Sequence, residues 1–153
     1  MGIIEKVRGK KIAGDQSLID REDTLIQRAV KTLTAAEVKA LNTTPIALVA
    51  APGAGKVNVV VEIFAKNTFL TTAFAGSNNL EFRYTSSNGA KVSADIDAAF
   101  LLLTATGYRS VKGVVTELTP VVNKPIVIDV PTADPTQGLG SVTVQVFYRT
   151  ITV

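Results

Sequence analysis

The sequence predicts a mainly β protein: a β-sandwich or jelly-roll-like domain with an extended N-terminal arm and one short helix. Three observations support this fold class. Hydrophobic residues make up 46% of the 153 residues, and most are Val, Ile, Leu and Ala accompanied by many Thr, which is typical of strands. Short apolar runs recur between turn-forming residues. They do not alternate with long helical segments, which argues against a doubly wound nucleotide-binding fold.

The N-terminal region differs from the rest of the chain because it is polar and rich in charge. Its apolar residues come in short groups, and Leu25, Ile26 and Val30 have the spacing of one face of a short helix. We therefore divide the chain into an N-terminal arm, residues 1–33, and a β-sandwich domain, residues 34–153. The arm is expected to be mobile or to become ordered against a neighbouring subunit.

A helix is predicted to begin directly after the arm. Thr34 and Glu37 have the spacing of a capping box, in which each side chain accepts a hydrogen bond from the backbone of the other residue. Val38 and Leu41 add an apolar contact three residues apart. Pro45 cannot continue the element, so we expect a helix of about two turns.

The remaining chain carries the signals of strands. Residues 88–89, Asn-Gly, favour a hairpin connection with positive φ, and residues 98–103 suit either a buried strand or one helical turn. In the last strand, alternation places Val142, Val144 and Val146 on one face. The predicted strands are 46–50, 57–65, 80–84, 92–96, 108–118, 125–130 and 141–153.

The composition removes much of ordinary catalytic chemistry. The chain has no Cys and no His, so it lacks thiolate nucleophiles, zinc–thiolate sites and the commonest general base near neutral pH. No apolar run reaches the roughly 20 residues that span a bilayer. We therefore predict a protein that is not an enzyme, with no catalytic residue, metal or cofactor and no membrane contact.

Residues 50–57 match a phosphate-binding loop only in part. Ala50 stands where the motif requires its first Gly, and Val57 stands where it requires the hydroxyl that binds magnesium. A strand rather than a helix is predicted to follow, so no helix N-terminus faces a phosphate. Pro52 and Gly53 instead predict a tight turn between strands.

Two pairs of carboxylates are candidates for catalytic or cation-binding groups. Asp95 and Asp97 share one face of a predicted strand, and Asp129 and Asp134 lie near a loop. No pattern brings either pair across a cleft, and the spacing of a calcium loop is missing. We expect these acids to be exposed residues of strands and loops.

Basic residues are concentrated near the N-terminus, where half of the sixteen precede residue 40. These basic residues either form a solvated arm or lie on an acidic partner surface. The solvated arm is slightly favoured, because five acidic residues reduce the positive charge of this region. The net charge of +3 is too small to predict specific nucleic-acid binding. The residues expected to contact a partner are Lys6, Arg8, Lys10, Lys11, Arg21 and Arg28.

Two segments resemble small structural proteins of tailed bacteriophages, in the group that includes head decoration (cement) proteins. They are TAAEVKALNTTPIALVAAPGAGK, residues 34–56, and NKPIVIDVPTADPTQGLGSVTVQVFYRTIT, residues 123–152. The resemblance implies a virion protein, assembled in the host cytoplasm, that binds the major capsid protein or another virion protein and stabilises the head. It also implies a homotrimer, and it implies no catalytic residue.

Two other functions remain open from the sequence. The first is a structural component of the tail, the baseplate or a fibre attachment. The second is a carbohydrate-binding β-sandwich, although such modules usually present exposed aromatic platforms, and this chain has no Trp and three Tyr. A single-stranded nucleic-acid surface at residues 82–84 or 147–149 is disfavoured, because alternation directs neighbouring rings to opposite faces.

Overall fold

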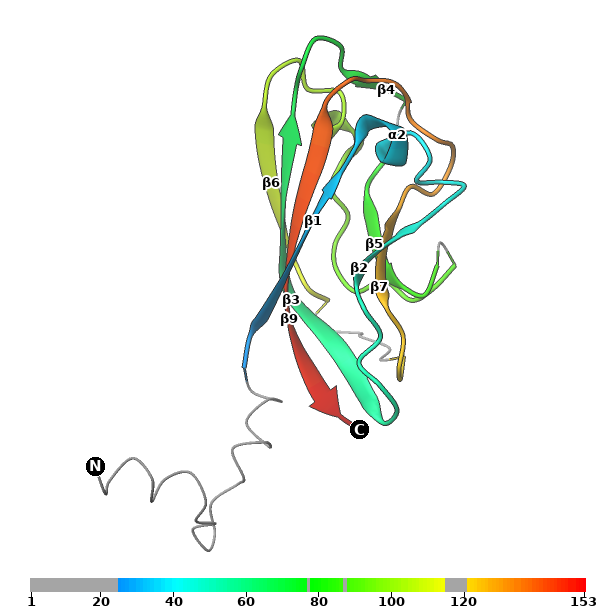
Figure 1. The fold of residues 1–153 in the computed structure, drawn as a ribbon, viewed down its shortest axis with the longest axis vertical. Coiled ribbons are helices and arrows are strands. Elements are labelled where there is room, and N and C mark those ends of the chain that lie inside the picture. Colours follow the sequence, from blue (N-terminus) through cyan, green and yellow to red (C-terminus); the bar gives the residue numbers. More distant parts are fainter. Residues whose placement is uncertain (1–24, 77, 87, 115–120) are drawn as a thin grey trace, which may run out of the picture.

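The computed structural model of this chain describes residues 25–76, 78–86, 88–114 and 121–153 (Figure 1). Strands dominate these residues, as predicted, and the two helical elements are short. In chain order the elements are β1 (Gln27–Leu33), α2 (Ala35–Val38), β2 (Ile46–Val49), β3 (Lys56–Thr68), β4 (Phe74–Ala75), β5 (Glu81–Tyr84), the 3-10 helix η2 (Ala98–Phe100), β6 (Gly107–Lys112), β7 (Ile126–Asp129), β8 (Thr136–Gln137) and β9 (Ser141–Thr152).

The largest sheet has four antiparallel strands in the order β1-β9-β3-β6. Its two long central strands, β3 and β9, pair over almost their whole length, with one register shift between Val60 and Glu62 that marks a β-bulge. The predicted face of β9 is confirmed, because Val142, Val144 and Val146 are fully buried. Strand alternation therefore separates a core face from an outward face in this sheet.

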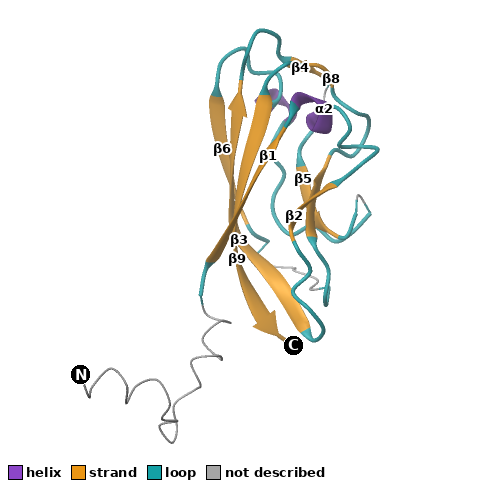
Figure 2. Ribbon diagram, viewed as in Figure 1, coloured by secondary structure: helices purple, strands orange, loops and turns teal. Residues whose placement is uncertain are grey.

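A three-stranded sheet, in the order β2-β7-β5, packs against the core face of the larger sheet (Figure 2). Phe82, Ile126 and Ile128 join the valines of β9 in one hydrophobic cluster. The hydroxyl of buried Tyr84 donates a 2.5 Å hydrogen bond across the layers to the backbone carbonyl of Asn58, and burial raises the pKa of Tyr84 to about 12. The predicted β-sandwich is confirmed. Strands β4 and β8 form a small additional sheet.

The segment 90–96 closes one side of the sandwich. Its backbone bridges Lys91 to Arg83 of β5 and Ile96 to Leu80 directly before β5, and it bridges the other layer where Ser93 faces Gly113. The prediction of a regular strand at 92–96 is therefore wrong. Because the segment divides its hydrogen bonds between β5 and the end of β6, it forms isolated bridges instead of one continuous ladder.

The start of the β-sandwich differs from the prediction. Residues 27–33, which we assigned to the arm, form β1 and pair with β9 from Gln27 opposite Tyr148 to Leu33 opposite Val142. The expectation that Val30 belongs to a helix is wrong, because the burial of β1 alternates with the two-residue period of a strand.

The predicted capping box at the start of α2 is confirmed. The Thr34 hydroxyl accepts a 3.2 Å hydrogen bond from the backbone N–H of Glu37, whose carboxylate accepts a 2.7 Å bond from the backbone N–H of Thr34. These contacts from Thr34 hold the pKa of Glu37 below its usual value. The helix is shorter than two turns because the backbone amides of Asn42 and Thr43 bind the carboxylate of Asp134 in a turn.

The predicted turn at residues 52–55 is also confirmed. Strand β3 follows it at once, and the backbone N–H of Lys56 donates to the carbonyl of Gly53 at 3.3 Å. Gly53 has a φ of 101°, which favours glycine. The open choice at residues 98–103 is resolved as helical, with η2 at Ala98–Phe100.

Candidate interaction surface

One of the six residues predicted to contact a partner lies in the described part of the chain. Arg28 is exposed on β1, opposite Phe147 of β9. Residues in register on neighbouring antiparallel strands share a face, so both side chains lie on the side of the four-stranded sheet that faces away from the core. Five predicted residues fall outside the described ranges: Lys6, Arg8, Lys10, Lys11 and Arg21.

We call this side of the four-stranded sheet the outer face. We define its members by register and alternation along β9 from Thr143 to Arg149, and none of them is buried. They are Arg28, Val30 and Thr32 of β1; Val59, Glu62, Phe64 and Lys66 of β3; Tyr108, Ser110 and Lys112 of β6; and Thr143, Gln145, Phe147 and Arg149 of β9.

Apolar side chains come from every strand of the outer face. Val30 is 50% exposed on β1 and Tyr108 is 53% exposed on β6. Between these edges lie Phe147 and Phe64, both partly exposed. The rings of Phe64 and Tyr108 contact each other, with centroids 5.8 Å apart and planes tilted by 35°. The outer face therefore presents apolar area to its surroundings without being uniformly hydrophobic.

Four basic residues and one acidic residue give the outer face a net charge of +3. Glu62 is paired, because its carboxylate lies 3.2 Å from Nζ of Lys112 in an exposed ion pair. Arg28, Lys66 and Arg149 have no ion pair within the residues that the structure describes. Their charges remain available to a partner, and exposed charges of this kind steer association and select partners.

The free edge of β1 is less suited to binding than the outer face. Lys31 lies in register with Val144, so its side chain leaves β1 on the core side. Its Nζ lies 3.9 Å from a carboxylate oxygen of Glu37. An inward-pointing charge on an edge strand discourages the addition of a further strand.

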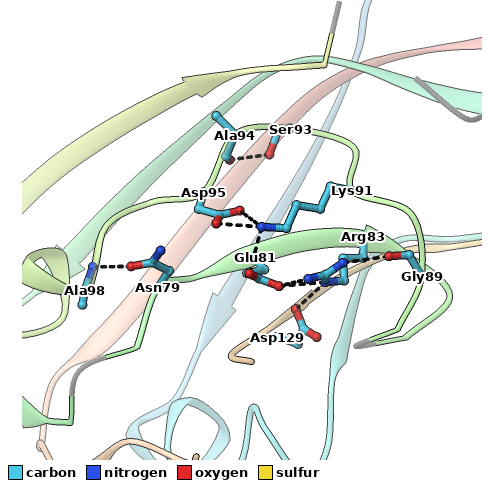
Figure 3. A network of polar contacts seen from close by, with 10 residues as sticks. All are labelled: Asn79, Glu81, Arg83, Gly89, Lys91, Ser93, Ala94, Asp95, Ala98 and Asp129. Atoms are coloured by element: carbon cyan, nitrogen blue, oxygen red, sulfur yellow. Dashed lines mark hydrogen bonds and ion pairs between the residues drawn. The ribbon is translucent and has the colours of Figure 1, made fainter. Parts of the chain in front are cut away.

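The three-stranded sheet carries a different group of charges on its own outward side (Figure 3). Glu81 and Asp129 face each other in register, and Arg83 is two residues from Glu81 on the same face. The Arg83 guanidinium donates to the carboxylate of Glu81, with Nε at 2.8 Å, and lies 3.9 Å from Asp129. Lys91 reaches Glu81 at 2.9 Å and Asp95 at 2.8 Å.

The pKa values of the two facing carboxylates are shifted in opposite directions. Asp129 is fully buried, and neither carboxylate oxygen has a hydrogen-bond partner among the described residues. Burial raises the pKa of Asp129, and nearby Arg83 offsets this only in part. Burial also acts on Glu81, but hydrogen bonds from Lys91 and Arg83 outweigh it and lower the pKa of Glu81. The expectation that Asp129 is an exposed acid is wrong.

The other acids considered from the sequence have structural partners. Asp97 lies 3.7 Å from Arg109, and Asp134 binds backbone amides after α2. In the described ranges, the acidic residues form no group of three or more that is placed to hold a metal ion. No helix among the same residues is long and apolar enough to cross a membrane.

A cavity of about 300 Å³ opens between the layers near the start of β1. Polar residues that line the cavity form hydrogen bonds with one another. The Gln27 side chain donates to the Thr150 hydroxyl at 3.3 Å, and that hydroxyl donates to the Asn58 side chain at 2.8 Å. No acidic residue lines it, so it offers no converging carboxylates for acid–base chemistry. The lining residues are Gln27, Val49, Ala50, Ala51, Pro52, Lys56, Asn58, Tyr148 and Thr150.

The sequence signals identified one part of the outer face. Charge density in the N-terminal region singled out Arg28, but Lys66, Lys112 and Arg149 were not predicted. They lie on the same face as Arg28 because the strands pair in the order β1-β9-β3-β6, which the sequence does not show. The period-two alternation of β3 and β9 was the signal that predicts which residues point outward.

Comparisons with known proteins extend these observations at the level of the fold. No protein-family model matches this chain, and no curated protein matches it in sequence. The fold is similar to that of a chain in the solved structure "Capsid of Ralstonia phage GP4", with a TM-score of 0.50 and 16% sequence identity. The alignment covers 81% of this chain and 82% of that one. At this identity, the likeness establishes a shared β fold.

Proposed function

We propose that this chain is a non-enzymatic structural protein of a bacteriophage virion, and more specifically a capsid decoration (cement) protein that binds and stabilises the assembled head. The observation that carries the proposal is the fold likeness to a chain of a phage capsid structure over 81% of the length. The resemblance of residues 34–56 and 123–152 to phage structural proteins points the same way.

The arrangement of charged groups supports a structural role. The buried carboxylates belong to an ion network around Arg83, and the cavity has no acidic lining residue. The cations that have no ion pair in the described residues include Arg28, Lys66 and Arg149 of the outer face. A protein that stabilises a particle needs such binding surfaces in repeating, symmetric positions.

The direct test is to locate the chain in particles. Virions produced from the genome that encodes it should contain the protein in a fixed stoichiometry by quantitative mass spectrometry, and electron cryomicroscopy should show its density on the outside of the head. Density on the tail or baseplate would replace the decoration role with a tail role. Absence of the chain from purified virions would overturn the virion proposal as a whole.

The arm is proposed to supply part of the contact with the major capsid protein or another virion protein. Its test removes residues 1–24, since removing residues 1–33 would also delete β1 from the sheet. The truncated protein should fold with an unchanged melting temperature but occupy fewer sites on particles that lack the protein. Full occupancy by the truncated protein would show that Lys6, Arg8, Lys10, Lys11 and Arg21 are not needed.

We also propose that the protein is a homotrimer, on the basis of its resemblance to decoration proteins. Light scattering coupled to size-exclusion chromatography measures this directly. A mass of three times the 16.1 kDa chain is expected, and a monomer at micromolar concentration would contradict the trimer without affecting the proposed location.

A further inference from the structure

The outer face combines exposed apolar groups with basic side chains that have no ion pair within the described residues. Val30 and Tyr108 are about half exposed, and Arg28, Lys66 and Arg149 lie among the apolar side chains of the same face. We propose that the outer face docks on an acidic surface of a different protein of the virion. This inference rests on the proposed virion role and adds to it the chemistry of the partner.

The dimensions of the outer face limit what it can do alone. Four strands about 4.8 Å apart, each contributing alternate residues over roughly 20 Å, present an area on the order of 400 Å². A stable interface buries about 800 Å² on each partner. The outer face therefore supplies about half of a standard interface, and an additional contact must supply the rest.

A second copy of the chain related by a two-fold axis is a poor occupant of this surface. Such an axis would bring the same face against itself. Each face carries a net charge of +3, so Arg28, Lys66 and Arg149 of one copy would meet the same cations of the other. Like charges brought together across an interface oppose association, so the charge argues against self-pairing of the outer face and favours an acidic partner surface.

Nucleic acid also fits the outer face poorly. Surfaces that bind single strands offer aromatic rings on which bases stack. Here the rings of Phe64 and Tyr108 contact each other, and β1 contributes one basic residue to this face, Arg28, followed by aliphatic Val30. A protein partner with acidic and apolar groups matches both features, because cations that lose water need carboxylates opposite them.

Zero-length crosslinking tests the partner's chemistry without any mutation. Carbodiimide treatment of intact virions joins lysine amines to carboxylates in direct contact. Crosslinks from Lys66 or Lys112 to Asp or Glu of another virion protein are expected, while exposed Lys124, which lies outside the outer face, serves as the internal control. Crosslinks confined to Lys124, or none from Lys66 and Lys112, would overturn the docking proposal.

Charge variants give the second test on particles that lack the protein. The double variant Arg28→Glu/Lys66→Glu should bind at least about tenfold more weakly than the unchanged protein, and Arg28→Gln/Lys66→Gln should give a smaller loss of the same sign. The control Lys124→Glu should bind normally. Circular dichroism melting of each variant separates lost binding from lost folding.

The outcomes distinguish the two proposals. If the chain is absent from virions, the proposed function fails. If it is present and both double variants bind as well as the unchanged protein, the virion role stands and the docking surface is wrong. A labelled oligonucleotide bound by the unchanged protein and released by Arg28→Glu/Lys66→Glu would also overturn the acidic-protein assignment, in favour of nucleic acid.

Discussion

The two larger sheets each have one side that faces away from the core, and both of these sides carry charged residues. The two sides differ in whether those residues form ion pairs within the chain. On the three-stranded sheet, Glu81, Arg83 and Lys91 are joined by contacts of 2.9 Å or less, with Asp129 beside them. On the outer face of the four-stranded sheet, Arg28 and Lys66 have no ion pair within the described residues. One side keeps its charges within the chain, and the other presents them outward.

Burial accounts for this difference. Side chains of Glu81 and Asp129 are 7% and 0% exposed, so their carboxylates have lost most of their water and need cations nearby. The outer-face cations remain hydrated and need no partner for the chain to fold. The comparison predicts that the first group controls stability and the second controls binding.

Removing Arg83 should have the largest effect on folding. Arg83→Ala leaves Glu81 and Asp129 close together without their shared guanidinium, and we expect a loss of roughly 3 kcal/mol in the free energy of unfolding. Urea denaturation followed by circular dichroism measures it.

The matched control for Arg83→Ala is Lys112→Ala, which breaks the exposed pair with Glu62 on the other sheet. An exposed ion pair contributes about 0–1 kcal/mol, so this variant should unfold close to the unchanged protein. Equal losses in the two variants would remove the distinction between the two sides.

Replacing Asp129 should have the next largest effect on the free energy of unfolding, and this effect should be stabilising. Its pKa lies above the ordinary value of 3.8 because burial desolvates the carboxylate. As pH rises, the Asp129 carboxyl therefore ionises at a lower pH in the unfolded state than in the folded state. Its ionisation lowers the free energy of unfolding above pH 3.8. Asp129→Asn should raise the unfolding free energy at pH 7 by on the order of 1 kcal/mol. The gain should disappear below pH 3.8.

Glu81→Gln is the control for this pH dependence. The pKa of Glu81 lies below its ordinary value of 4.5, so its ionised form contributes stability above pH 4.5 that is lost as pH falls through the folded-state pKa. This variant should be destabilised at pH 7, by an amount that shrinks in acid. A pH titration of urea unfolding in which both variants shift the same way would contradict the assigned roles.

The sequence predicted long strands whose signal is local, and it missed β1, whose stability comes from pairing with a distant strand. Alternating valines located β9, and the capping box located the start of α2. We assigned β1 to the arm because residues 1–33 are polar and rich in charge. In the structure Lys31 occupies a core-side position, which breaks the apolar alternation of a strand. Its pairing with β9 joins residues more than a hundred positions apart, and no local pattern carries that information.

The interaction surface was predictable only in part, for the same reason. Charge density along the chain drew attention to Arg28, whereas Lys66 and Arg149 become its neighbours through strand order. Asp129 was expected to be exposed because a single acid in a strand usually is. Its burial depends on Glu81, which lies in register with it on β5, and on Arg83 two residues further along β5, a tertiary arrangement that overrides the local pattern.

The smallest expected effect on folding comes from the outer face. Arg28→Glu/Lys66→Glu replaces one exposed and one partly exposed cation that have no ion pair in the described chain, and such surface changes usually alter the unfolding free energy by less than about 0.5 kcal/mol. Thermal unfolding in low salt measures this shift. A loss comparable to that of Arg83→Ala would mean that these cations stabilise the sheet, and their exposure would then not indicate binding. An unchanged melting temperature together with weaker binding to particles would show that the two sheets divide stability and recognition between their outward sides.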